Sequence, residues 1–188
     1  AWYAHPVHLF ENQAKWFVLL WFTGFFIFLL RFSGSLLYVY RLKTYQVYNV
    51  DDQWNTKLRN LCGRIGLQRP VQLVESARDR IPMTIGYFKP VILLPLGTLS
   101  GVPPQQIDAI LLHELAHILR KDYLLNITQS VIELLFFYHP VTWWLSSMIR
   151  QEREHICDDL AVCINHDHIN YIKALTTMEE LNSKSPLL

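Results

Sequence analysis

Five consecutive residues, His113-Glu114-Leu115-Ala116-His117, have the types and the spacing of a zinc-binding catalytic motif. An α-helix turns about 100° per residue, so two histidines four positions apart lie one turn apart on nearly the same face. Two imidazoles in that relation can bind one Zn²⁺, and the glutamate between them lies within reach of a metal-bound water. The motif therefore predicts metallopeptidase chemistry, with His113 and His117 as zinc ligands and Glu114 as the general base.

Residues on both sides of this motif predict the helix that must hold it. Pro103 and Pro104 end the preceding segment, and proline suits the first position of a helix. Apolar side chains then recur at helical spacing through the motif. We expect the helix to end near Lys121-Asp122, where Arg120 and Lys121 complement the negative end of the helix dipole. The alternative is that the polar residues of the motif lie on a solvated helix face without a metal.

A third zinc ligand is expected from a later helix, because a catalytic zinc usually has three protein ligands and one open position for water. The candidate segment is 152–159, in which Glu154 and Asp158 lie four residues apart on one face. Glu154 can bind the metal, and Asp158 can accept a hydrogen bond from the free ring nitrogen of a ligand histidine. His155 and Asp159 form a rival pair with the same spacing. Spacing alone leaves both pairs open, as well as the possibility that the whole cluster is a solvated helix face.

Peptide hydrolysis also needs a group that stabilises the developing oxyanion, and the sequence singles out none. Four side chains near the predicted site are candidates by type: Tyr123, His139, Arg150 and Arg153.

Residues 16–40 form a nearly continuous apolar run that is long enough to cross a bilayer as a helix. Aromatic residues near its ends are typical of membrane interfaces. Arg31 is the exception, and a charge at that depth is expected to snorkel or to face a helix bundle. Basic residues are more numerous after this run than before it, so the positive-inside rule places the motif on the cytoplasmic side. The alternative is a buried helix of a soluble core.

The remaining patterns predict an α+β fold that is mostly helical. Three strands are expected before the motif, at Val71–Glu75, Met83–Phe88 and Val91–Pro95, and an exposed edge of this small three-stranded sheet can bind an extended substrate backbone. Helices are expected over 51–66, 124–138 and 141–163, and a last helix runs through 171–181 with Asp167 or Asn170 as its cap. Whether 124–138 enters the membrane stays open at this length. We divide the chain into an N-terminal membrane segment, 1–42, and a zinc metallopeptidase domain, 43–188.

Composition narrows the class of protein further. The formal net charge of +1 gives no reason to expect direct binding of nucleic acid. Cys62, Cys157 and Cys163 form no Cys-x-x-Cys pair, so we expect them to be buried, reduced thiols rather than a disulfide framework. The chain begins at Ala1, and we expect it to be a fragment of a longer protein.

Four ordered blocks of the sequence resemble the BlaR/MecR-type integral membrane zinc metallopeptidases. The blocks are Pro82–Pro95, His113–Asn126, Phe137–Trp144 and Glu152–Val162. The resemblance implies a gluzincin-like fold in which His113, His117 and Glu154 hold Zn²⁺. It also places the Glu-x-x-x-Asp signature, shared with the Ste-type CAAX proteases, on Glu154 and Asp158.

The same resemblance implies a function in signal transduction. Such peptidases of the bacterial inner (cytoplasmic) membrane act on the cytoplasmic side, where they cleave a cytoplasmic regulator or themselves. The implied partners are a protein substrate, such as a transcriptional repressor for an antirepressor peptidase, and membrane lipid. The best-known members respond to β-lactams, but these residues show no sensor module with a Ser-x-x-Lys nucleophile. The stimulus therefore stays open: it is either another signal or one detected by a sensor outside this fragment.

Two other classes of function compete with this hypothesis. One is a membrane signalling scaffold whose zinc site is structural or catalytically idle, for instance closed by His155 as a fourth ligand. The other is a helical membrane-anchor module without a metal.

Overall fold

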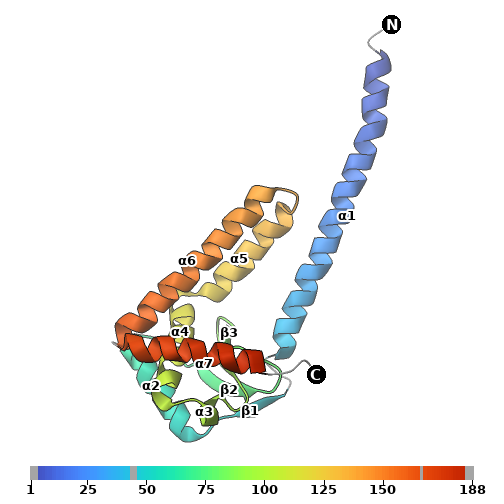
Figure 1. Cartoon of the computed structure of the whole chain (residues 1–188). Helices are drawn as coiled ribbons and strands as arrows, with labels where there is room; N and C mark the ends of the chain where they lie inside the picture. The colour runs from blue at the N-terminus through green and yellow to red at the C-terminus, as the bar shows by residue number, and fades with distance from the viewer. Residues whose placement is uncertain (1–3, 43–45, 166, 185–188) are drawn as a thin grey trace.

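The computed structural model describes residues 4–42, 46–165 and 167–184, which fold into a compact body with two long projections (Figure 1). The sheet and helices α2, α3, α4 and α7 form the body, while α1 and the α5–α6 hairpin extend from it to the same side. In chain order, the elements are α1 Ala4–Leu42, β1 Val47–Asn49, α2 Asp52–Arg64, β2 Gln72–Ser76, β3 Met83–Ile85, β4 Val91–Pro95, α3 Thr98–Gly101, α4 Pro104–Arg120, α5 Asp122–Leu135, α6 Pro140–Asn165 and α7 His168–Lys184.

The sheet has four strands in the order β1-β2-β4-β3, so the prediction of a three-stranded sheet is wrong by one strand. β2 and β4 are parallel at its centre, and β1 and β3 pair antiparallel at its edges. β1 was missed because its three residues are too few to show an alternating pattern. β3 ends at Ile85 rather than Phe88 because Gly86 has φ 94°, a conformation that leaves the extended backbone. The edge position of β3 keeps one of its sides free of a strand partner among the described residues.

Helix α4 passes through the core of the body and carries the metal-binding motif. Ile107, Leu111 and Leu115, which belong to the apolar residues at helical spacing, are fully buried, and so is Leu112. The helix begins at Pro104 and ends at Arg120, as expected. Lys121 then takes a left-handed conformation, with φ 62°, and α5 begins at the next residue. This sharp turn sends the chain out of the core and into the hairpin.

The helices predicted over 51–66, 124–138, 141–163 and 171–181 are present, with ends shifted by one to three residues. The helix that contains the apolar run 16–40 is longer than predicted, because α1 begins twelve residues earlier, at Ala4. Asp167, one of the two expected caps of the last helix, accepts a hydrogen bond from the Asn170 backbone N–H at 3.0 Å. Cys62 and Cys157 are buried free thiols, as predicted, but Cys163 is exposed. Cys163 lies about 240° around α6 from Cys157 and so faces away from the body.

Helix α1 is long and apolar enough, over Ala14–Leu42, to cross a membrane, and none of its most apolar window is buried. That exposure does not fit the alternative of a buried helix in a soluble core. α1 meets the α5–α6 hairpin at the hairpin's turn, where the Phe137 ring lies 5.2 Å from Phe28 and 6.1 Å from Trp21, measured between ring centroids. Gly24 permits this approach, because a Cβ atom there would lie 2.6 Å from Phe137 Cε2.

Gly24→Ala should therefore weaken the packing of α1 on the hairpin. The added methyl must displace the edge of the Phe137 ring, so we expect a loss of about 1 kcal/mol, relative to the control, in the free energy of unfolding in detergent micelles. Gly34→Ala is the matched control, because nothing lies within 4 Å of a Cβ there and alanine favours the helix. Equal stability of the two variants would show that the α1–hairpin contact does not form.

Candidate metal centre

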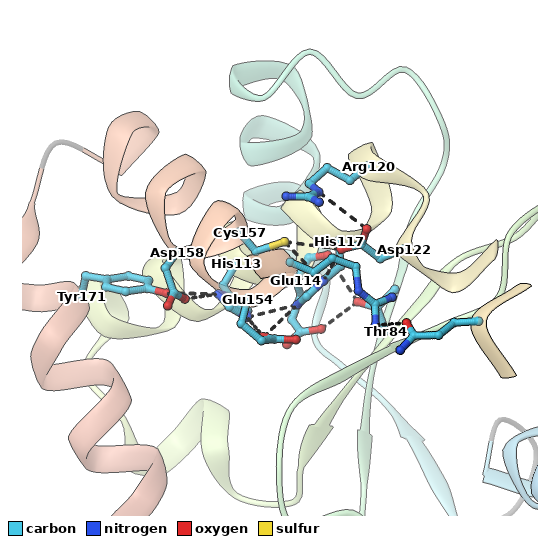
Figure 2. A network of polar contacts seen from close by, with 12 residues as sticks. Thr84, His113, Glu114, His117, Arg120, Asp122, Glu154, Cys157, Asp158 and Tyr171 are labelled. Carbon is cyan, nitrogen blue, oxygen red and sulfur yellow. Dashed lines mark hydrogen bonds and ion pairs between the residues drawn. The ribbon is translucent and has the colours of Figure 1, made fainter. Parts of the chain in front are cut away.

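Three side chains that can bind a metal lie close together between helices α4 and α6 (Figure 2). His113 and His117 lie on α4 with their Nε2 atoms 3.2 Å apart. Glu154 reaches them from α6, and its Oε2 lies 3.6 Å from His113 Nε2 and 3.7 Å from His117 Nε2. The structure thus brings together the three residues that the sequence predicted as ligands.

The spacing of these atoms fits a metal ion. A tetrahedral zinc with bonds of about 2.0–2.1 Å separates its ligand atoms by about 3.3–3.4 Å. The three measured distances, from 3.2 to 3.7 Å, bracket that value. Two histidines and a carboxylate are also the donor set of an open catalytic zinc site. The rival pair His155 and Asp159 is exposed to solvent and does not belong to this donor group.

Asp158 and Tyr171 both contact the outer ring nitrogen of His113, Nδ1, which is the nitrogen that does not face Glu154. Asp158 Oδ1 lies 3.0 Å from His113 Nδ1, which is the contact expected of Asp158 from its position on α6. The Tyr171 hydroxyl lies 3.1 Å from the same nitrogen and donates a hydrogen bond to Asp158. This arrangement favours the tautomer of His113 that turns a free Nε2 toward the metal position. Sequence reasoning missed Tyr171, because its helix α7 carries no motif that relates it to α4.

Asp122 holds the outer nitrogen of His117 on the opposite side of the site (Figure 2). Its Oδ2 lies 2.8 Å from His117 Nδ1, and its side chain is buried. The left-handed turn at Lys121 places this first residue of α5 back against the motif helix. Sequence reasoning missed Asp122 as well, although a search for an acidic partner of each ligand histidine was a way to find it.

Cys157 forms a second cluster with His117 and Asp122, at the ring nitrogen of His117 that does not face Glu154. Its Sγ lies 3.3 Å from His117 Nδ1 and donates to Asp122 Oδ2 at 3.5 Å. Burial, followed by the negative charge of Asp122, raises the pKa of the Cys157 thiol to about 12. His113 and Glu154, in contrast, approach His117 at its Nε2. We therefore interpret Cys157 as part of the hydrogen-bonded support of His117.

Glu114 is buried between α4 and the edge strand β3. The hydroxyl of Thr84, in β3, donates a hydrogen bond to Glu114 Oε2 at 2.8 Å. This contact fixes the direction of the carboxylate, which lines the same cleft as both histidines. Thr84 is a further residue that the sequence did not single out, since strand residues that orient an acid show no characteristic spacing.

The electrostatics of the donor group favour a positive charge within it. Burial lowers the pKa of His113, but the hydrogen bond with Glu154 and the charges of Glu114 and Asp158 outweigh it, so the pKa is raised. The same hydrogen bond lowers the pKa of Glu154. Four carboxylates, those of Glu114, Asp122, Glu154 and Asp158, therefore surround the two imidazoles and attract a cation, which can be a proton or a metal ion.

The cleft beside the donor atoms has a volume of about 440 Å³. β3 and the residues after it form one wall, and the junction of α4 and α5 forms another. Of the four oxyanion candidates, only Tyr123 lines this cleft among the described residues. Arg150 is paired with Glu133, and Arg153 is buried against Gln129.

Comparison with known proteins gives consistent results. A family profile described as BlaR1 peptidase M56 matches residues 4–187. The regulatory protein BlaR1 of Bacillus licheniformis is 29% identical over 143 residues, which cover 76% of this chain and 24% of that protein. The methicillin resistance mecR1 protein of Staphylococcus aureus (strain Mu50 / ATCC 700699) is 29% identical over 105 residues, or 55% of this chain and 18% of that protein. The chain thus spans a quarter or less of these relatives' length.

Asp158→Asn should weaken zinc binding without removing a ligand. An amide is a poorer partner for the ring N–H of His113, and loss of such an orienting carboxylate typically costs about 10- to 100-fold in metal affinity. Asp159→Asn, one residue further on an exposed face of α6, is the matched control and should leave the affinity unchanged. Competition with a chelator measures both, and equal affinities would contradict the role of Asp158.

Zinc affinity should also depend on pH, because metal binding must displace the proton from His113. The raised pKa of His113 means that protons begin to compete above pH 6.5, the ordinary value for histidine. Below the raised pKa we expect affinity to fall by about tenfold per pH unit for each proton displaced. The dissociation constant measured from pH 8 to pH 6 checks this, and a constant value across that range would contradict it.

Proposed function

The chain belongs to the BlaR1 peptidase M56 family, and from that premise we propose that it is a zinc-dependent endopeptidase held at the bacterial inner membrane. We place the peptidase domain at residues 43–188 and the membrane segment at 1–42. The observation that carries the proposal is the group of His113, His117 and Glu154 with Glu114 beside it on one cleft wall. The substrate is a cytoplasmic regulator, such as a transcriptional repressor, or the protein itself.

We assign His113, His117 and Glu154 as the ligands of Zn²⁺, in the manner of gluzincins. The bound zinc supplies a water of lowered pKa and polarises the carbonyl of the scissile peptide bond. Asp158 and Asp122 keep the two imidazoles in the orientation that binding requires, as their contacts of 3.0 and 2.8 Å support.

Glu114 is the general base and acid in this proposal. Its carboxylate lines the cleft next to the ligand histidines, held by Thr84. It can take a proton from a water in the cleft and later deliver that proton to the leaving amine. A structural or idle zinc site does not need such a glutamate, and His155, which would close the site, does not lie in the group formed by His113, His117 and Glu154. Both observations favour the enzyme over the scaffold.

The edge strand β3 is the proposed binding place for the substrate backbone. Met83 and Thr84 of this strand line the cleft, and β3 pairs only with β4 among the described strands. An extended segment of substrate can add to this edge through main-chain hydrogen bonds. That mode requires an unfolded or flexible stretch of the target protein, which fits cleavage at a linker.

We infer the side of the membrane from charge. The basic residues that follow the apolar run, beginning with Arg41 and Lys43, outnumber the single Lys15 before it. By the positive-inside rule, this asymmetry supports a cytoplasmic position for the body and its cleft.

Glu114→Gln tests this proposal, because the amide cannot accept the proton while all three ligands remain. We expect stoichiometric zinc and a cleavage rate lower by about 10²- to 10⁴-fold. Metal analysis and quantitative mapping of new protein N-termini in cells that express each full-length variant measure these two properties. Glu152→Gln, at an exposed position of α6, is the control and should cleave like the wild type.

Two outcomes would contradict the assignment. Cleavage at the wild-type rate by the Glu114→Gln variant removes the role of Glu114 as a base. Absence of zinc from the wild-type protein removes the metal mechanism altogether.

A further inference from the structure

The outward surface of the α5–α6 hairpin exposes many large apolar side chains, which is unusual for a protein surface in water. We call residues 131–149 the hairpin tip. Its exposed side chains include Trp144 (61% exposed), Tyr138 (58%) and Ile149 (51%). Between Asp122 and Arg150, Glu133 is the one Asp, Glu, Lys or Arg in the sequence. Contiguous apolar surface of this kind marks contact with a membrane or a partner.

Glu133, the one acidic side chain of the hairpin tip, is only 17% exposed. It is paired with Arg150 at 2.8 Å between α5 and α6, and Arg150, next to the tip, is 47% exposed. Glu133 also lines a cavity of about 450 Å³ between the hairpin and α1, and Arg31 of α1 lines the same cavity. Arg31 is exposed on α1, but it borders this cavity, which is where a charge within a membrane is expected to lie.

We propose that the hairpin tip is embedded in the lipid hydrocarbon beside α1, entering from the side of the peptidase body and returning to it. The hairpin leans toward α1 and meets it at the tip (Figure 1). The contact is made by Phe137 with Trp21 and Phe28, within the span of α1 that can cross a membrane. The exposed apolar surfaces of α1 and the hairpin tip adjoin at this contact. A bilayer that surrounds α1 therefore also surrounds the hairpin tip.

The contact with α1 also sets how deep the tip reaches. Phe28 lies near the middle of the span Ala14–Leu42, about 21 Å from its Leu42 end at 1.5 Å per residue. The hydrocarbon core of a bilayer is about 30 Å thick. Phe137 also packs against Gly24 and Trp21, about 27 and 32 Å from the Leu42 end, so the tip reaches past the middle of the span. α5, with 14 residues, is too short to cross a bilayer.

The backbone of the turn fits an environment without water, where each polar group needs an internal partner. The His139 N–H donates to Phe136 O at 2.9 Å, and the Thr142 N–H donates to His139 O at 3.1 Å. The indole N–H of Trp143 donates to Phe137 O at 2.9 Å. The turn thus uses a tryptophan side chain to satisfy a main-chain carbonyl at the point farthest from the body.

One consequence concerns the metal centre. Asp122, at the base of α5, contacts His117, so the hairpin that enters the membrane is joined directly to the donor group. The cleft then lies close to the membrane surface. Substrate segments near that surface are the ones it can reach.

Site-directed spin labelling of the full chain in phosphatidylcholine–phosphatidylglycerol vesicles tests the proposal. Labels are placed at Trp144→Cys and Val141→Cys in the tip, in a Cys163→Ser background. Leu30→Cys in α1 serves as the lipid reference and Asn60→Cys in α2 as the water reference, since both positions are exposed. The experiment depends on α1 crossing the bilayer and is independent of zinc and of peptidase activity.

We expect both tip labels to collide readily with dissolved oxygen and several-fold less often with a water-soluble nickel complex than the label at Asn60, as the Leu30 label does. Nickel access equal to that at Asn60 would place the tip in water and overturn the proposal. Low access to both reagents would show that a second copy or another protein segment covers the tip, which overturns lipid contact. Ready access of the nickel complex to the label at Leu30 would show that α1 does not cross the bilayer, and would overturn the proposal.

Discussion

The packing of α6 across the buried helix α4 brings Glu154 to within 3.7 Å of both motif histidines, and the chemistry of the molecule depends on that contact. Two histidines on one helix turn can hold a metal only weakly unless a third donor meets them at the right distance. The core residues of α4 are fully buried, so the helix has little freedom to rotate its histidines away. The donor geometry is thus a property of the core, and the loops contribute little to it.

Two carboxylates near this contact orient the imidazoles by accepting hydrogen bonds from their Nδ1 atoms. Asp158 comes from α6 and Asp122 from the base of α5, so each histidine is oriented by a different element. Tyr171 adds α7 to the same network through its contacts with His113 and Asp158. Movement of any of these helices therefore changes the orientation of a proposed ligand. The hairpin, which begins at Asp122 and meets α1 at its far end, offers a mechanical link between the membrane segment and the site.

The sequence predicted the parts of the site that have local spacing. The His113–His117 motif, its helix, and the Glu154–Asp158 pair each depend on a helical period that one segment carries alone. Spacing left Glu154 and His155 as alternatives, and only the packing of α6 on α4 brings Glu154 to the two histidines. Asp122, Thr84 and Tyr171 were missed because they come from a turn, a strand and a distant helix that tertiary structure brings together. β1 was missed for a similar reason, since its three residues form a strand only through pairing with β2.

X-ray absorption spectroscopy of the zinc-loaded protein tests whether His113, His117 and Glu154 bind zinc and leave one position open. We expect a first shell of nitrogen and oxygen atoms only, at about 2.0–2.1 Å, with histidine scattering and a total of four ligands. A sulfur neighbour at about 2.3 Å would show that Cys157 binds the metal, and would contradict the assignment of both the ligands and the buried thiol.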